Sequence, residues 1–243
     1  MIGSFLNVVI YRVPLEKSIV TPRSYCPLCN TMIKFYDNIP VLSYILLKGR
    51  CRNCKTRISP LYPGVELFTA LSFLLAYLHF DPAMLHMTAA IVFICLILAL
   101  GLIDLKHQIL PLEMTIGGAV VFLIYSFFNP AISPINAFGT AFGAALTFAA
   151  IYFLYLKVRK IEGLGQGDIW MMLMLGAFLG VNKLVIAVLL ASLTGLVVGL
   201  FFIIFKKKNL KFALPFGTFL SLGSYISLFW GNDILRFIQS LYR

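Results

Sequence analysis

The chain alternates between long apolar runs and short polar connections, apart from one polar stretch at residues 14–63. The runs predict helices at residues 1–13, 64–80, 84–104, 111–129, 135–156, 169–181, 184–205 and 212–231. A helix that crosses a bilayer needs about 20 apolar residues, and most of these runs approach that length. Because the connections are short, successive helices are expected to be antiparallel neighbours. The pattern predicts an all-α polytopic membrane protein with about eight transmembrane helices.

The first run, residues 1–13, is shorter than a bilayer requires. No small-residue cleavage site follows it, so it lacks the pattern of a secretory signal peptide. It is interpreted as a shortened first transmembrane helix. We expect three parts along the chain: this helix, a loop at residues 14–63 and a helical bundle at residues 64–243.

Composition also favours a lipid-facing surface. Hydrophobic residues make up 60% of the chain and charged residues 12%, whereas soluble domains average about 45–50% apolar and about 25% charged residues. A chain of 243 residues cannot bury that much apolar surface in its own core. A bilayer is therefore the expected surrounding.

The formal net charge of +11 would on its own suit a nucleic-acid partner. The positions of the charges argue against that interpretation. With the amino terminus outside, all of the 20 Lys and Arg residues except Lys183, Arg236 and Arg243 fall on one side of the predicted bundle. Lys and Arg gather on the cytoplasmic side of membrane proteins, where anionic lipid attracts them. We predict that loop 14–63 faces the cytoplasm and that the partner is lipid, with no nucleic acid.

Loop 14–63 contains two Cys-x-x-Cys hooks separated by 21 residues. Two such hooks can hold Zn²⁺ in a tetrahedron of four thiolates, which leaves no open position for catalysis. The predicted ligands of this structural zinc site are Cys26, Cys29, Cys51 and Cys54. Two disulfides are the alternative, which a reducing cytoplasm disfavours. Cys95 lies alone in an apolar run, where packing explains it.

The chain has nine acidic residues, and four of them adjoin apolar runs. Ionisable groups at such positions are costly and are functional candidates. Glu66 and Glu113 each follow a proline in a predicted first helical turn, where a negative charge suits the helix dipole, so a structural role is preferred for both. The acids in loops or near helix ends are expected to be solvated: Glu16, Asp37, Asp81, Glu162 and Asp233.

The other two acids, Asp104 and Asp168, fall at the cytoplasmic ends of their predicted helices. Asp104 ends a helix at its carboxyl end, where the dipole disfavours a carboxylate. Asp168 has a simpler alternative as a helix cap, but Gly165 and Gly167 before it permit closer backbone approach than a cap requires. Two carboxyl groups at one site favour sharing a proton, so that one acts as acid while the other activates water. The pair predicts an aspartic protease.

An ordered set of motifs resembles the type IV prepilin peptidases. The matching segments are residues 3–14, the two cysteine hooks, residues 38–44, residues 62–67, Ile103-Asp104 with residues 108–111, Gly165-Gln166-Gly167-Asp168, and Pro215-Phe216-Gly217. Gly-x-Gly-Asp alone is a weak motif, and the ordered set is specific. Where the family commonly has an aspartate after Leu-Pro, this chain has Leu112 and then Glu113, which puts a role for that second acid in doubt.

The resemblance implies a bacterial inner-membrane enzyme that cleaves the leader of a prepilin or pseudopilin after a glycine, with Asp104 and Asp168 as its catalytic pair. It also implies N-methylation of the new amino terminus with S-adenosylmethionine, although the chain has no glycine-rich dinucleotide fingerprint. Three alternatives stay open: a peptidase without methyltransferase activity, an ion-coupled transporter with acids in broken helices, and a membrane-anchored zinc adaptor without catalysis.

Overall fold

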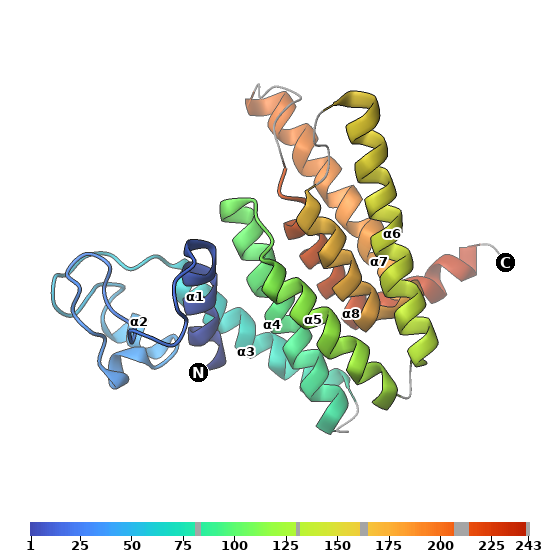
Figure 1. Ribbon diagram of the computed structural model, residues 1–243. Helices are drawn as coiled ribbons and strands as arrows, with labels where there is room; N and C mark the ends of the chain where they lie inside the picture. Colours follow the sequence, from blue (N-terminus) through green and yellow to red (C-terminus); the bar gives the residue numbers. More distant parts are fainter. Residues whose placement is uncertain (81–83, 130–131, 161–164, 207–213, 242–243) are drawn as a thin grey trace. The chain divides into compact units, whose positions relative to one another are not determined.

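The computed structural model describes residues 1–80, 84–129, 132–160, 165–206 and 214–241 (Figure 1). Helices make up nearly all of the regular structure in these ranges, with two isolated β-bridges and no longer strand. This confirms the all-α prediction. The chain divides into two compact units, Met1–Ala83 and Met84–Arg243.

The first unit is built on two antiparallel helices. Its elements are α1 (Ile2–Arg12), η1 (Val13–Leu15), η2 (Phe35–Asn38), α2 (Leu42–Leu46) and α3 (Leu61–His79). A Cβ atom on Gly3 of α1 would lie 2.8 Å from the Cα atom of Glu66 in α3, so the two backbones are in direct contact. Four residues later along α1, the Asn7 side chain donates to the carbonyl of Tyr62 at 3.1 Å. The polar loop connects these two helices.

The second unit is a helical bundle. Its elements are α4 (Met84–His107), α5 (Leu112–Tyr125), η3 (Ser126–Phe128), α6 (Pro134–Arg159), α7 (Gln166–Lys206) and α8 (Phe216–Leu241). Apolar faces meet in its core, where the ring of Phe93 stacks on that of Phe178 at 4.2 Å and also meets Phe122. Short connections make α4 and α5 antiparallel, as the sequence predicts.

The helix α7 is two helices joined at Gly180, whose φ of 68° and ψ of 173° are not helical. After this residue the chain turns back along α8. Lys183 Nζ donates to the Leu228 carbonyl at 3.1 Å, and a Cβ on Gly195 would lie 3.4 Å from the ring of Phe219. Later residues of α7 therefore contact earlier residues of α8. This confirms the prediction of two helices and moves their junction from 182–183 to Gly180.

Four described helices are long and apolar enough to cross a bilayer: Leu61–His79, Leu85–His107, Pro134–Val158 and Gln166–Phe205. The last of these contains the reversal at Gly180. The predicted end of the final helix at residue 231 is wrong, because α8 continues to Leu241. The predicted start of that helix at residue 212 lies outside the described ranges. So do several of the charged residues considered above: Asp81, Glu162, Lys207, Lys208, Lys211 and Arg243.

Candidate active site and metal centre

Asp104 lies in the last turn of α4 and is buried, with 6% of its surface exposed. Its Oδ2 atom accepts the backbone N–H of Thr218 at 2.7 Å and lies 3.1 Å from the Thr218 hydroxyl. Thr218 is the third residue of α8, where N–H groups lack partners within the helix. The positive end of the α8 dipole thus offsets the unfavourable position of the Asp104 carboxylate at the negative, carboxyl end of α4.

Asp168 is the third residue of α7 and is 5% exposed. Its Oδ2 atom accepts the N–H of Gly165 at 3.1 Å, and its own N–H donates to the carbonyl of Gly165 at 3.1 Å. The bond from the Asp168 side chain to the Gly165 N–H is one half of a capping box, and Gly165 has no side chain to supply the other half. The alternative in which Asp168 is itself the residue that caps the helix is therefore wrong, because α7 begins two residues earlier, at Gln166. A capping carboxylate needs no burial of this degree, so capping does not account for the whole environment of Asp168.

Shared contacts with one residue place the two aspartates at the same end of the second unit. Leu110, in the connection between α4 and α5, contacts the neighbours of both. A Cβ on Gly167 would lie 2.7 Å from Leu110 Cβ, and one on Gly217 would lie 3.0 Å from Leu110 Cδ1. The latter would also lie 3.1 Å from Cγ of Asp104. Glycine at 167 and 217 therefore leaves the room that Leu110 occupies.

The predicted support from Gly165 and Gly167 has a geometric basis. Gly165 caps α7, while Gly167 permits the close approach of Leu110. Between them, Gln166 donates to the hydroxyl of the buried Tyr152 in α6 at 3.1 Å. The segment is thus attached to α6 on one side and to the Leu110 connection on the other.

Sequence reasoning missed Thr218 and Leu110. Thr218 follows the Pro215-Phe216-Gly217 motif directly, so the motif was the available signal. The contact joins residues 114 positions apart, and neither periodicity nor spacing predicts which two helix ends meet. Leu110 is apolar, and its place in the motif at residues 108–111 was the available signal.

The predicted first-turn position is confirmed for Glu113 and wrong for Glu66. Glu113 lies in the first turn of α5 and is exposed, as expected. The expected first-turn position of Glu66 is wrong, because α3 begins earlier, at Leu61. Its Oε2 atom instead accepts the N–H of Val41 at 2.8 Å. Val41 has a φ of 61°, which is costly for a β-branched residue, so Glu66 helps to hold an unfavourable turn in the loop.

The four cysteines of the loop form one cluster, with all their Sγ atoms within 4.8 Å of one another. The Sγ atoms of Cys26 and Cys54 are 3.8 Å apart, and all five cysteines are thiols. Zn–S bonds of about 2.3 Å in a tetrahedron imply S···S distances of about 3.8 Å. The donor set and its spacing therefore fit Zn²⁺.

The two hooks have the same backbone geometry. The N–H of Cys26 donates to the carbonyl of Thr31 at 3.0 Å, and the N–H of Cys51 donates to that of Thr56 at 2.8 Å. Each hook then turns through a residue of positive φ that directly follows its second cysteine, namely Asn30 and Lys55. The hydrogen bonds of Thr31 lower the pKa of the Cys29 thiol to about 6. The thiolate is thus favoured at Cys29, whereas burial and the neighbouring sulfur atoms raise the pKa of Cys54 to about 11.

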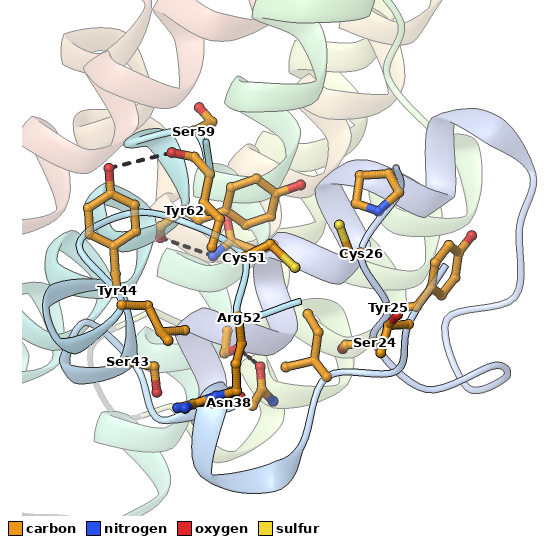
Figure 2. A pocket seen from close by; sticks show the side chains of 18 of the residues that line it. Ser24, Tyr25, Cys26, Asn38, Ser43, Tyr44, Cys51, Arg52, Ser59 and Tyr62 are labelled. Carbon is orange, nitrogen blue, oxygen red and sulfur yellow. Dashed lines mark hydrogen bonds and ion pairs between the residues drawn. The ribbon is translucent and has the colours of Figure 1, made fainter. Parts of the chain in front are cut away.

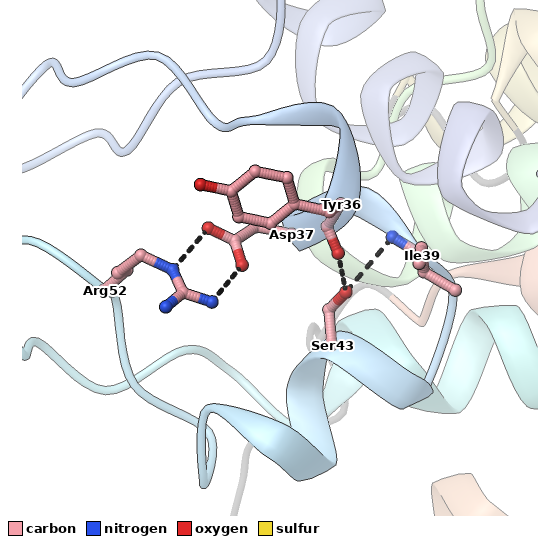
Figure 3. Close-up of polar contacts among 5 residues, drawn as sticks. All are labelled: Tyr36, Asp37, Ile39, Ser43 and Arg52. Atoms are coloured by element: carbon pink, nitrogen blue, oxygen red, sulfur yellow. Dashed lines mark hydrogen bonds and ion pairs between the residues drawn. The ribbon is translucent and has the colours of Figure 1, made fainter.

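Contacts outside the sulfur cluster hold the hooks together. Figure 3 shows Arg52, between the cysteines of the second hook, donating to both oxygens of Asp37 at 2.8 and 2.6 Å. Asn53 donates to the hydroxyl of Thr31 in the first hook at 2.9 Å. The Arg52 hydrogen bonds lower the pKa of Asp37. The expectation that Asp37 is merely solvated is therefore wrong, because this carboxylate has a bidentate guanidinium partner.

A cavity of about 590 Å³ lies in the first unit between the hooks and the two helices. Figure 2 shows Cys26 and Cys51 on its wall together with Tyr25, Tyr44 and Tyr62. Buried Arg12 also lines it, and its guanidinium donates to the carbonyls of Ser18 and Arg23 and lies over the ring of Tyr25. The walls combine aromatic faces with polar groups, as is usual in small-molecule sites.

Two family models match the chain: the Bacterial Peptidase A24 N-terminal domain over residues 1–80, and the Type IV leader peptidase family over residues 90–200. A prepilin leader peptidase/N-methyltransferase from Aeromonas salmonicida is 34% identical, and the match covers 99% of this chain and 91% of that protein. A protein of the same name from Myxococcus xanthus is 43% identical over 82% of this chain and 59% of its own length.

A type 4 prepilin-like proteins leader peptide-processing enzyme from Escherichia coli is 38% identical, with 94% of this chain and 90% of that protein covered. No solved structure matches the chain. The identities extend over nearly the whole length of two of these relatives, and they include both units of the structure. The chain belongs to the type IV leader peptidase family.

Proposed function

We propose that this protein is a membrane aspartic endopeptidase that removes the leader peptide of type IV prepilins or pseudopilins, with Asp104 and Asp168 as its catalytic pair. The observation that carries the proposal is the burial of both carboxyl groups at one end of a single bundle. Family membership supports the reaction and the substrate class.

The chemistry follows from two carboxyl groups that interact. One carboxyl group is protonated and donates to the leaving amine of the scissile bond, while the other carboxylate takes a proton from the attacking water. No covalent enzyme intermediate is needed, because the carboxylate activates water instead of attacking the peptide itself. The described residues around Asp104 supply donors from α8, and those around Asp168 supply the N–H of Gly165.

We propose that the protein lies in the bacterial inner membrane with eight transmembrane segments, counting the two halves of α7 separately. The aspartates and the cysteine loop both face the cytoplasm in this arrangement. The concentration of Lys and Arg on one side supports it. Lys183 contacts Leu228, which lies further along α8 than the Thr218 that binds Asp104, and this separation supports an outer position for Lys183.

The four loop cysteines hold a structural Zn²⁺, since a complete thiolate set leaves no open coordination position. We propose in addition that the protein methylates the new amino terminus with S-adenosylmethionine, which binds in the cavity of the first unit. The names of the relatives, the volume of the cavity and its tyrosine-lined walls support this second activity.

Incubation of the purified full-length protein with a prepilin, followed by mass spectrometry of the products, tests both activities. We expect cleavage after a glycine without any addition, and a methylated amino terminus once S-adenosylmethionine is added. Intact prepilin in both reactions would contradict the peptidase and favour a transporter or a zinc adaptor. Cleavage without methylation would leave the peptidase and reject the methyltransferase.

A further inference from the structure

Thr218 presents two donors to one oxygen of Asp104. Its backbone N–H lies 2.7 Å from Oδ2, and its hydroxyl oxygen lies 3.1 Å from the same atom. The hydroxyl also lies 2.9 Å from the carbonyl oxygen of Gly101, one turn earlier in α4. A hydroxyl has one proton and two lone pairs, so it donates to one of these two oxygens at a time.

This arrangement suits both protonation states of Asp104. When Asp104 is a carboxylate, the Thr218 hydroxyl donates to Oδ2. When Oδ2 carries a proton, the hydroxyl turns its own proton to the Gly101 carbonyl and offers a lone pair to the acid. A group that exchanges a proton in each catalytic cycle needs surroundings that accept both states.

The backbone holds this contact in place from both sides. A Cβ on Gly101 would lie 2.8 Å from Cβ of Ser221, and one on Gly217 would lie 3.1 Å from Cγ of Asp104. The two glycines therefore let α4 and α8 approach closely enough for the hydroxyl of Thr218 to reach across. The side chain is not free to move away without separating the helices.

The hydroxyl of Thr218 differs from those of three other helical threonines. The hydroxyls of Thr69, Thr147 and Thr194 donate to the carbonyl four residues earlier in the same helix. That local bond is the usual choice for a threonine inside a helix. Thr218 instead places its hydroxyl on a different helix, at the carboxyl group of Asp104.

We propose that Thr218 is a positioning residue of the peptidase site, whose hydroxyl stabilises Asp104 in both its ionised and its protonated forms. The proposal rests on the proposed catalytic role of Asp104. It assigns no contact with the substrate to Thr218. A loss of its hydroxyl should therefore lower kcat and leave KM unchanged.

The test uses purified full-length protein and measures kcat and KM for prepilin cleavage. Thr218→Val keeps the shape of the side chain and removes the hydroxyl. We expect kcat to fall about 10-fold, which corresponds to the loss of one hydrogen bond to a charged group. Thr218→Ser restores the hydroxyl and should restore kcat to within about twofold. Thr194→Val is the matched control, because its hydroxyl bonds only within α7, and should leave kcat unchanged.

Asp104→Asn is measured in the same series. An inactive Asp104→Asn variant together with full kcat in Thr218→Val would overturn the role of Thr218 and leave the function intact. Activity in Asp104→Asn would instead overturn the proposed function. A Ser variant as impaired as the Val variant would assign the effect to packing and reject the hydroxyl. If Thr218→Val fails to fold, Thr218→Ala, which adds no bulk, carries the same comparison.

Discussion

Leu110 packs directly on Gly167, one residue before Asp168, so closely that a Cβ atom at 167 would lie 2.7 Å from Leu110 Cβ. Real Cβ atoms do not approach to this distance. The contact lies between an apolar connection and the start of α7, and it sets how close the two aspartate-bearing segments come.

Gly167→Ala is expected to push the Leu110 connection away from α7 at a cost of about 1–3 kcal/mol, as overpacking does, and to lower prepilin cleavage. Leu110→Gly removes the Cβ atom of Leu110 that crowds position 167. The double variant should regain part of the lost activity, which kcat for prepilin cleavage measures. Gly143→Ala is the control, since nothing lies within 4 Å of its added Cβ. Equal activity of all four proteins would contradict the role of this contact.

Asp104→Asn and Asp168→Asn should each leave the protein folded and lower the rate of prepilin cleavage by about 10²–10⁴-fold, the usual weight of a positioned acid or base. Asn keeps the size of Asp and removes the ability to exchange a proton. Asp233→Asn serves as the control because this acid is exposed on α8. Full cleavage by either purified dyad variant would remove that aspartate from the mechanism.

The prediction from sequence succeeded where the bilayer determines the pattern. Helices that face lipid must be long and apolar, so the approximate positions of the helices follow from hydropathy. The family and the cysteine cluster also follow from local motifs. Contacts between helix ends cannot be predicted from local motifs. The partner of Asp104, for example, is an uncharged threonine 114 residues away.

Two local expectations failed for related reasons. Glu66 was assigned to a first helical turn because Pro63 precedes it, yet α3 begins before that proline, at Leu61. The polar loop predicts a solvated Asp37, whereas Arg52 of the second hook is its partner in the structure. In both cases an acidic side chain pairs with a loop residue that the sequence pattern does not specify.

One Zn²⁺ per chain is expected from metal analysis of the purified protein, and replacing Cys26 and Cys54 by Ser should abolish it. The Sγ atoms of Cys26 and Cys54 lie 3.8 Å apart and come from different hooks. Replacing both cysteines therefore leaves one thiolate in each hook. Cys95→Ser is the control, since Cys95 belongs to α4 and stands outside the cluster. A metal-free native protein, or unchanged zinc in the double variant, would reject the site.

Gly180→Ala should destabilise the protein by about 1–3 kcal/mol, because a φ of 68° with a ψ of 173° is a conformation that only glycine adopts readily. The added Cβ would also lie 3.3 Å from Ile132 Cδ1. Thermal unfolding of the detergent-solubilised chain measures the effect, with Gly139→Ala in α6 as the control. A stability equal to that of the control would show that the junction tolerates a helical or extended residue.

The reversal at Gly180 also bears on how the chain enters the membrane. The junction is one residue long, so no hydrophilic segment needs to be carried across the lipid between the two halves of α7. Residues 166–206 are therefore suited to enter as a helical hairpin, in which each half satisfies its own backbone hydrogen bonds. Biogenesis of this protein should accordingly depend on Gly180 even where the mature fold tolerates a replacement.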